Sequence, residues 1–303
     1  MNGDSNVPVL LMMIPTAHIS RLTIGLLLLL ALSSCERVYP EPPQNYTPSS
    51  VQELRSYFDN LHYDLTLLEQ GIPRLVVTDL PADFTLIDNT RERKRLFIMT
   101  LLPLVLLTNE EILADRQRAE KLLDEYRRKQ KIMNHDRAWL HELAERYRLD
   151  KLRLEDHAFS VQLLRNVDTL PVSLVLAQAA NESGWGTSRF ALEGNNLFGE
   201  WTFAKGTGMV PRERRPGATH EVRLFNNLQS SLRSYMHNLN THRAYTGLRK
   251  IREQLRNAGQ RPDGPSLARG LHAYSERGSA YILDIEQMIR DNRFTLFADA
   301  QLR

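Results

Sequence analysis

The sequence predicts a mainly α-helical protein with a small β element, which places the chain in the mainly α class or, at most, in the α+β class. Residues 92–148 are expected to form long helices, and over residues 109–148 apolar residues recur at helical spacing among charged ones. Residues 199–227 are rich in glycine and proline, which indicates a loop-rich insert that could hold short strands. From residue 228 to the end we expect two or three further helices, with a loop near residues 258–265.

Composition and charge limit the class of protein. Of the 303 residues, 42% are hydrophobic and 25% are charged, as in an ordinary folded soluble protein. This excludes a disordered chain, a collagen and a polytopic membrane protein. With 39 Lys and Arg against 36 Asp and Glu, the net charge of +3 is too small to imply nucleic acid binding. It is compatible with an acidic polymer or an anionic surface as partner.

Several kinds of chemistry are not supported by the sequence. The single cysteine, Cys35, excludes an intramolecular disulfide and a cysteine-based metal site. The nine histidines show no metal-ligand spacing, the glycines lack a phosphate-loop pattern, and the serines lack a nucleophile elbow. We therefore expect no metal and no cofactor.

The N-terminus resembles a bacterial lipoprotein signal. Arg21 precedes an apolar run over residues 24–32 that is too short to span a bilayer comfortably. The run leads through Leu-Ser-Ser into Cys35, as in a lipobox, where small residues fit a narrow protease cleft and the thiol accepts the diacylglyceryl group. We predict a signal peptide over residues 1–34 and a membrane attachment through lipid on Cys35. An ordinary signal peptide with a chance cysteine, or an uncleaved anchor, is the alternative.

The residues after the cysteine predict a sorting signal and a tether. By resemblance to Gram-negative lipoproteins, Glu36 in place of an aspartate favours the outer membrane, so we expect an envelope lipoprotein at the periplasmic face. Residues 35–50 are rich in proline and polar residues and are predicted to be a flexible tether. A helix is then expected from Val51, with Ser50 as its cap and Glu53 at its third position.

Residues 51–150 are interpreted as an N-terminal helical region. Within it, residues 71–90 are expected to be loop with one short strand. The apolar run Leu96–Leu107 contains Pro103 and has 12 residues, too few for a second transmembrane span. We therefore interpret this run as a buried helix.

Residues 151–303 are interpreted as a second region. Its first part, residues 158–180, is predicted to hold two helices that are broken at residues 167–171. Asp168 or Thr169 is the expected cap of the second helix, whose first turn would hold the proline at position 171.

Glu182 is the first candidate for chemistry. It stands at the end of a helix built from small and aliphatic residues, where the helix macrodipole disfavours negative charge. Partial burial would act in the same direction, so both effects favour a carboxylic acid that keeps its proton near neutral pH. Such an acid suits glycoside cleavage. An exposed helix-end residue without a function is the alternative.

The residues after Glu182 supply candidates for sugar binding. Glycines on both sides of Trp185 would let a substrate approach the backbone, and the indole could offer a flat apolar surface. Amides at Asn195 and Asn196, in a turn with Phe198, would suit N-acetyl and hydroxyl groups. The alternative is that the tryptophan belongs to the core.

These residues resemble one family. The run Leu176–Ala191, followed by Asn195–Gly199, is similar to the signature of the bacterial β-N-acetylglucosaminidases of glycoside hydrolase family 73, which include the flagellar rod-cap domain and the Bax proteins. The Bax-type members are the most similar. Their features resemble further runs of this chain, at His220–Phe225, Tyr235–Tyr245, Tyr274–Gly278, Leu101–Val105 and Asn109–Leu113. The resemblance covers residues 90–292 and is strongest over residues 171–292.

The resemblance implies a lysozyme-like helical domain with a small β-lobe beside a groove. Glu182 matches the catalytic acid of the family. A second carboxylate, a base on the β-lobe, would be Glu221, with Arg223 two residues later to favour its charge; Glu213 is a weaker candidate. A solvated strand charge is the alternative for Glu221. The family cleft is also lined by tyrosines, of which Tyr274 is our first candidate for a catalytic role.

Tyr281 is the second tyrosine and is expected to bind substrate; packing in the core is the alternative for both. If Glu221 lies far from the sugar, the 2-acetamido group of the substrate could act as the nucleophile instead. The inverting and the substrate-assisted routes both stay open.

The function implied is a monomeric peptidoglycan hydrolase that cleaves the β-1,4 bond after N-acetylglucosamine. A muramidase or lytic transglycosylase is one alternative, because these enzymes also use a Glu-Ser motif on a lysozyme-like fold. A non-catalytic peptidoglycan-binding protein that retains the groove is the other.

Overall fold

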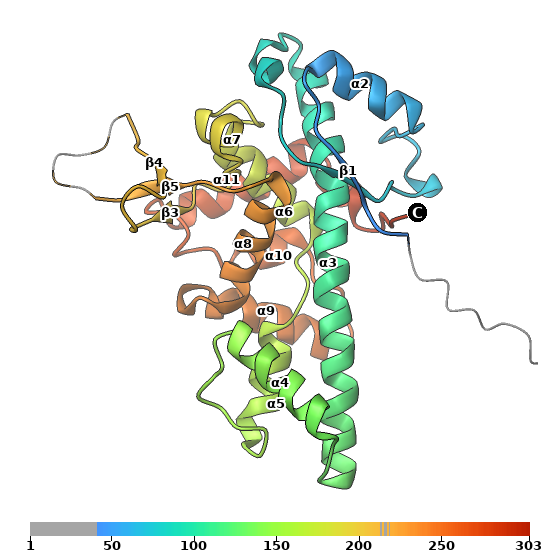
Figure 1. Cartoon of the computed structure of the whole chain (residues 1–303), viewed down its shortest axis with the longest axis vertical. Helices are drawn as coiled ribbons and strands as arrows, with labels where there is room; N and C mark the ends of the chain where they lie inside the picture. Colours follow the sequence, from blue (N-terminus) through green and yellow to red (C-terminus); the bar gives the residue numbers. More distant parts are fainter. Residues whose placement is uncertain (1–40, 213, 215–216, 218) are drawn as a thin grey trace, which may run out of the picture. The chain divides into compact units, whose positions relative to one another are not determined.

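The structure, a computed structural model, describes residues 41–212, 214, 217 and 219–303 (Figure 1). The predicted signal peptide, Cys35 and Glu213 lie outside the described residues. Residues 42–303 form one unit with one continuous hydrophobic core. Helices dominate and the strands are few and short, so the predicted mainly α, lysozyme-like fold with a small β-lobe is confirmed.

The first half of the chain contains a short parallel strand pair and the longest helix. Its elements are β1 (Gln44–Tyr46), α2 (Val51–Asn60), η1 (Leu68–Gln70), β2 (Leu75–Val77), η2 (Ala82–Leu86), α3 (Thr90–Lys129), α4 (Asn134–Arg146) and α5 (His157–Asn166). The second half carries α6 (Val172–Ser183), α7 (Arg189–Gly194), β3 (Trp201–Thr202), β4 (Gly208–Met209), β5 (Glu221–Arg223), α8 (Leu228–Thr241), η3 (Arg243–Tyr245), α9 (Thr246–Asn257), α10 (Gly264–Ala268), α11 (Ser279–Asp291) and η4 (Phe294–Phe297).

The folded part begins earlier than the sequence predicted. β1 pairs in parallel with β2, with Gln44 opposite Leu75, although β1 lies within residues 35–50, which were expected to be a flexible tether. The strand is held because the ring of Tyr46 stacks on Tyr57 of α2, with centroids 3.6 Å apart. A short pattern of polar residues and prolines does not reveal such a long-range partner.

The start of α2 is as predicted. The Oγ of Ser50 accepts a hydrogen bond from the backbone N of Glu53 at 3.2 Å. In return, the carboxylate of Glu53 accepts from the backbone N of Ser49 at 2.9 Å. These reciprocal bonds satisfy amides that the helix itself leaves free.

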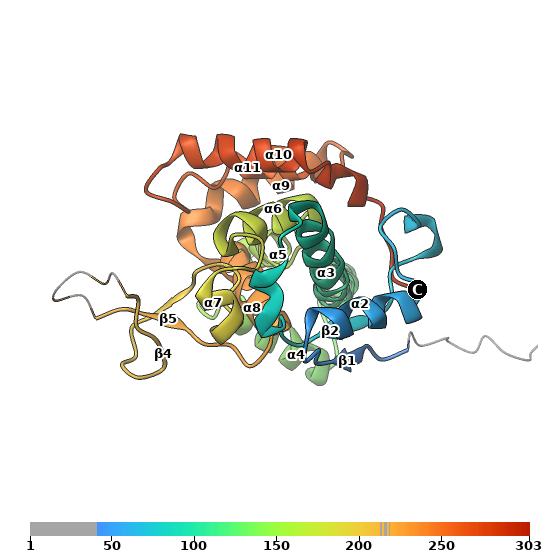
Figure 2. The ribbon, with the colours of Figure 1, turned by 90° about the horizontal axis from the view of Figure 1, so that it is seen from above.

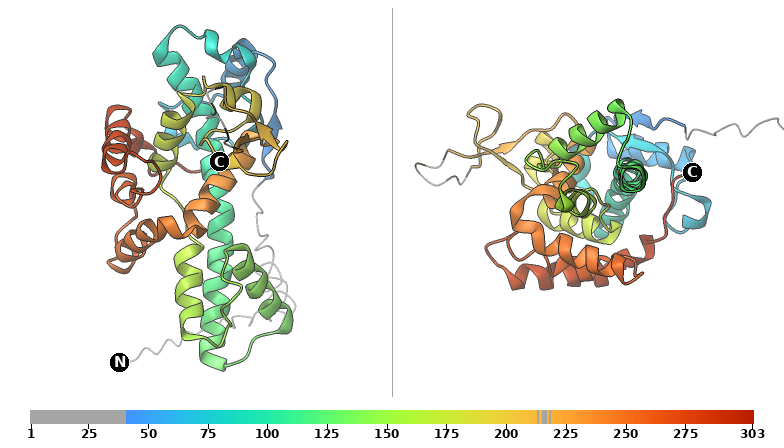
Figure 3. Two further views of the ribbon diagram at one scale, coloured as in Figure 1. Left: turned by 90° about the vertical axis from the view of Figure 1, so that its left-hand side faces the viewer. Right: turned by 90° about the horizontal axis from the view of Figure 1, so that it is seen from below.

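Helix α3 contains the predicted buried run. Among the described residues it is long and apolar enough to cross a membrane, yet 72% of its most apolar window is buried inside the protein. Residues Leu96–Leu107 pack within the core, and the helix continues through Pro103. α4 and α5 lie beside the C-terminal half of α3 (Figures 1 and 3). The run is therefore part of the protein core.

Helix α6 is surrounded by other helices. It contacts α3, α10, α11 and η4, and the view in Figure 2 shows it in the middle of them. Ala177, Ala179 and Ala180 are at most 1% exposed. Their small side chains allow this close approach, because the backbone of a neighbouring helix can come near.

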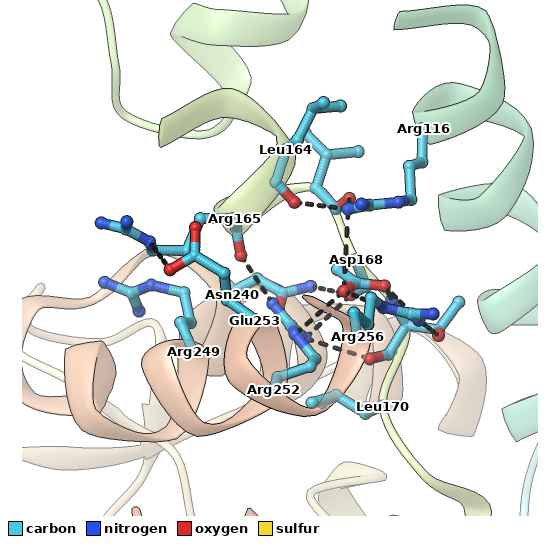
Figure 4. Close-up of polar contacts among 12 residues, drawn as sticks. Arg116, Leu164, Arg165, Asp168, Leu170, Asn240, Arg249, Arg252, Glu253 and Arg256 are labelled. Carbon is cyan, nitrogen blue, oxygen red and sulfur yellow. Dashed lines mark hydrogen bonds and ion pairs between the residues drawn. The ribbon is translucent and has the colours of Figure 1, made fainter. Parts of the chain in front are cut away.

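The segment between α5 and α6 holds a cluster of salt bridges around Asp168. The prediction that Asp168 or Thr169 caps α6 is wrong. Pro171 is itself the N-cap residue of α6, and no side chain caps the helix. Asp168 instead points into the protein, where its carboxylate accepts both guanidinium bonds of Arg256 at 2.6 Å and lies 3.3 Å from Nε of Arg252 (Figure 4). Arg116 of α3 lies 3.6 Å from the same carboxylate.

The β-lobe and the C-terminal helices complete the fold. The glycine-rich insert forms an antiparallel sheet of order β3-β5-β4, with Thr202 opposite Glu221. After it, the described residues hold the four helices α8 to α11, more than the two or three expected. The additional one is α10, a five-residue helix with a proline in its first turn, too short to show a hydrophobic period.

Candidate active site

Glu182 ends helix α6, and one of its two oxygens is held by neighbours. Oε1 accepts hydrogen bonds from the hydroxyl of Tyr281 at 2.7 Å and from Nδ2 of Asn181 at 3.2 Å. Oε2 accepts none from the described residues, and the side chain is half-buried. The arrangement therefore leaves one oxygen of the carboxyl group open to a ligand.

A chain of buried hydrogen bonds fixes this geometry. The hydroxyl of Tyr235 donates to Oε1 of Gln178 at 2.6 Å, and Nε2 of Gln178 donates to the hydroxyl of Tyr281 at 2.9 Å. Tyr281 in turn donates to Glu182. Because Gln178 uses both ends of its amide, each hydroxyl has one orientation, and the proton of Tyr281 must point at the glutamate.

Tyr281, and not Tyr274, is the tyrosine that contacts Glu182, which reverses the order we predicted. The Tyr281 ring is buried and stacks on Tyr274 with centroids 5.3 Å apart. The hydroxyl of Tyr274 points elsewhere, at the carbonyl of Phe198, at 3.4 Å. Burial, and then the charge of Glu182, raise the pKa of Tyr281, so it remains a hydrogen-bond donor at neutral pH.

The other rings of this cluster are Phe198, Tyr235 and Tyr245. Phe198 stacks on Tyr235 with centroids 3.8 Å apart, and Tyr245 lies 6.0 Å from Tyr274. Burial raises the pKa of Tyr245, and the charges of Glu200 and Glu182 raise it further. Both carboxylates therefore lie close enough to Tyr245 to affect it.

The turn after α6 packs against the core of the protein. Gly186 is buried, and a Cβ there would lie 2.7 Å from Cδ1 of Leu80. The ring of Trp185 packs edge-on against Phe97 at 5.7 Å, and Nζ of Lys94 lies 4.5 Å from its centroid. The indole is half-buried, and these contacts favour packing, the alternative that the sequence left open for Trp185.

The turn over residues 195–199 is also structural. Asn196 is 1% exposed and uses its whole amide, because Nδ2 donates to the carbonyls of Glu200 and Arg223 while Oδ1 accepts from the backbone N of Glu200. Asn195 adopts the left-handed conformation at the end of α7, and its Nδ2 donates to Asp79 at 2.7 Å. The amide of Asn196 therefore has no group left for a sugar, and the Phe198 ring is stacked on Tyr235. Oδ1 of Asn195 is buried and has no hydrogen-bond partner among the described residues.

Glu221 lies in strand β5 as expected, but its surroundings differ from the prediction. It is 5% exposed, and its two oxygens accept hydrogen bonds from the backbone amides of Gly206 at 3.0 Å and Gly208 at 2.9 Å. These bonds lower its pKa, helped by the charge of Arg214. Arg223, which we expected to support Glu221, contacts Ser234 and Glu200 instead. The Glu221 carboxylate ties the β3–β4 turn to β5.

Two polar residues of this region escaped the sequence reasoning. Gln178 precedes Glu182 by four positions, so the helical period places both on one face of α6. A glutamine in an otherwise apolar helix was a signal that could have been used. Glu200 directly follows the turn over residues 195–199, and nothing in its local sequence marks it. Among the described residues, no three His, Cys, Asp or Glu side chains gather in a way that could hold a metal ion.

Comparisons with known proteins point to one family. A family model described as "Glucosaminidase: Mannosyl-glycoprotein endo-beta-N-acetylglucosaminidase" matches residues 158–293. The chain is 34% identical over 204 residues to Protein bax of Escherichia coli (strain K12). The matched stretch covers 66% of this chain and 70% of that protein. No solved structure matches. The matched residues contain Glu182 and its tyrosine cluster.

Proposed function

Because the chain belongs to the glucosaminidase family of glycan hydrolases, as a Bax-type member, we propose that it cleaves the β-1,4 glycosidic bond after N-acetylglucosamine in peptidoglycan. In this proposal Glu182 is the general acid. The observation that carries it is the asymmetry of the Glu182 carboxyl group: Tyr281 holds Oε1, and Oε2 has no partner among the described residues.

The asymmetry suits proton donation to a leaving group. An oxygen that accepts two hydrogen bonds acts as the carbonyl oxygen of a neutral carboxyl group, so the proton belongs on Oε2. From there it is transferred to the glycosidic oxygen as the C1–O bond breaks. The bonds from Tyr281 and Asn181 then stabilise the carboxylate that remains, since hydrogen bonds to a charged acceptor are the stronger ones.

The test is turnover by Glu182→Gln with purified peptidoglycan as substrate. The amide keeps the shape of the site but has no proton to give, so turnover should fall about 10²–10⁴-fold, while thermal unfolding and glycan binding are unchanged. Glu193→Gln is the matched control, because Glu193 lies exposed on α7 in a long ion pair with Arg189. Wild-type-like digestion by Glu182→Gln would refute the assignment.

The products decide between the proposed bond and its alternatives. Mass spectrometry of the fragments should find N-acetylglucosamine at the new reducing ends. Muramic acid or anhydromuramic acid at those ends would mean a muramidase or a lytic transglycosylase instead. Binding of the wild-type protein to peptidoglycan without any fragments would mean a non-catalytic wall-binding protein.

We also propose that the protein works as a monomer at the cell envelope, attached through lipid on Cys35 with its folded part at the periplasmic face of the outer membrane. The lipobox-like sequence and the family's action on glycan support this. Cys35→Ser should block the attachment of labelled fatty acid and leave unprocessed precursor. Detection of a mature, unacylated N-terminus beyond residue 35 in the native protein would contradict it.

A further inference from the structure

Glu200 is a half-buried carboxylate, 19% exposed along its side chain, with one oxygen left without a partner among the described residues. Its Oε2 accepts a hydrogen bond from Oγ of Ser234 on α8 at 2.8 Å and lies 3.7 Å from Nη1 of Arg223 on β5. Its Oε1 is buried and has no hydrogen-bond partner among the described residues. Leaving a buried acceptor unpaired costs about 1–3 kcal/mol. A structural carboxylate would avoid this cost, as the fully bonded Glu221 does.

The backbone of Glu200 is held firmly, so the unpaired oxygen is not the result of a loose loop. Its N–H and C=O are both bonded to the side chain of Asn196, at 3.0 and 2.9 Å. The same carbonyl also accepts from the backbone N of Arg223 at 2.8 Å. The turn and strand β5 together therefore fix where the side chain begins.

Glu200 and Glu182 both act on the same tyrosine cluster. The charges of both carboxylates raise the pKa of Tyr245, after the effect of its burial. Tyr245 contacts Tyr274, whose ring stacks on Tyr281, the partner of Glu182. Tyr274 also donates to the carbonyl of Phe198, two residues before Glu200. The fold thus brings two carboxylates, 18 positions apart in the chain, to one cluster.

We propose that Glu200, and not Glu221, is the second carboxylate of the site and the base that activates water. The inference rests on the proposed function. Water attacks C1 while the C1–O bond breaks; Oε1 of Glu200 takes one proton from the water, and Glu182 gives one to the leaving oxygen. The products are a new hydroxyl on C1 and a hydroxyl on the leaving sugar. Glu200 then loses its proton to solvent and Glu182 regains one, which restores the resting site.

The environment of Glu200 suits this task. A base is best served by an oxygen that no donor holds, such as Oε1 of Glu200, whereas both oxygens of Glu221 accept hydrogen bonds from backbone amides. Burial raises the pKa of Glu200, which makes it a stronger base, whereas the hydrogen bond from Ser234 and the charge of Arg223 lower this pKa. Attack by this water from the face opposite to the leaving group predicts inversion at C1.

The decisive experiment is the anomer of the new reducing end, followed by ¹H NMR during cleavage of glycan strands by the wild-type protein. Inversion of a β-1,4 bond gives the α-anomer first. The β-anomer would overturn the proposal and favour the substrate-assisted route. This measurement uses no variant, so it stands even if a Glu200 substitution fails to fold.

Substitutions of Glu200 provide a second test of the proposal. Glu200→Gln should lower turnover about 10²–10⁴-fold, while the control Glu193→Gln leaves it unchanged. Azide added to Glu200→Ala should restore cleavage and yield an α-glycosyl azide, because the anion needs no base. Turnover of Glu200→Gln within tenfold of wild type would overturn the proposal. Loss of the proposed function itself would look different, since the wild type would then release no fragments ending in N-acetylglucosamine.

Discussion

At the scale of single residues, the hydroxyl of Tyr281 makes the shortest hydrogen bond to the carboxyl group of Glu182. Tyr281→Phe removes the 2.7 Å bond to Oε1 and keeps the ring stack on Tyr274. A hydrogen bond to a charged group is worth about 1.5–3 kcal/mol, so turnover should fall about 10–100-fold. Steady-state kcat measures this, with Tyr274→Phe as the control, because that hydroxyl makes only a 3.4 Å bond to a carbonyl. A larger loss in Tyr274→Phe than in Tyr281→Phe would restore the order predicted from the sequence.

Glu221 gives a residue-scale prediction about pH. Its pKa is lower in the folded protein than in the unfolded chain because Gly206 and Gly208 donate their amides to its carboxylate. The resulting stability is present above the ordinary pKa of glutamate and is lost as the pH falls through the lower, folded-state pKa. Glu221→Gln should therefore lower the melting temperature at pH 7, and this difference from wild type should shrink as the solution is acidified.

The measurement is thermal unfolding of both proteins from pH 7 down to the acid limit of folding. A difference in melting temperature that stays constant with pH would contradict the assigned role. If Glu221→Gln melts like the wild type and loses turnover by orders of magnitude, Glu221 is the base after all, and Glu200 is not.

At the scale of elements, the end of α6 holds Glu182 in place through two glycines with positive φ. Gly184, at φ 58°, is the left-handed residue that closes the helix, and Gly186, at φ 80°, lets the chain pass against Leu80 and Phe97. Gly184→Ala meets no contact shorter than 3.3 Å. It should cost only about 1–2 kcal/mol for the left-handed conformation.

Gly186→Ala carries the same conformational cost and an overlap with Leu80 at 2.7 Å in addition. Overpacking of a core costs about 1–3 kcal/mol more. Denaturant unfolding of the two variants should therefore rank Gly186→Ala as the less stable. Equal free energies of unfolding would mean that Leu80 can shift and make room for the added methyl group.

At the scale of the whole molecule, Asp168 joins three parts of the fold. It sits between α5 and α6 and is 2% exposed, and its carboxylate binds Arg252 and Arg256 of α9 and reaches Arg116 of α3 (Figure 4). Arg252 is 1% exposed along its side chain, and burial lowers its pKa to about 10. Removing the anion leaves this cation buried without a counter-charge.

Asp168→Asn should therefore lower the free energy of unfolding by about 3–5 kcal/mol. Glu253→Gln is the comparison, because Glu253 pairs with Arg165 at 2.9 Å while both side chains are about a quarter exposed. Such a pair is worth at most about 1 kcal/mol. Denaturant unfolding measures both values, and a loss below 1 kcal/mol in Asp168→Asn would show that the arginines find other partners.

The sequence by itself determined the features that depend on neighbours in the chain. Helical spacing predicted α3, α5 and α6, and the Ser50 cap needs only residues three positions apart. The run around Glu182 pointed to the family, which the comparisons support. These signals are readable because backbone hydrogen bonds and caps are satisfied within a few residues.

The tertiary structure decided which side chains surround Glu182. Tyr281 reaches Glu182 across 99 positions of the chain, and Gln178 reaches Tyr281 across 103, through the packing of α11 on α6. The same holds for Asp168, which its place before Pro171 suggested as a helix cap and which binds arginines 84 and 88 positions away. The local sequence identifies a polar residue but does not indicate which distant residue forms its hydrogen bonds. That partner follows from how the helices pack, because each buried polar group must find its hydrogen bonds among the atoms that the fold brings near.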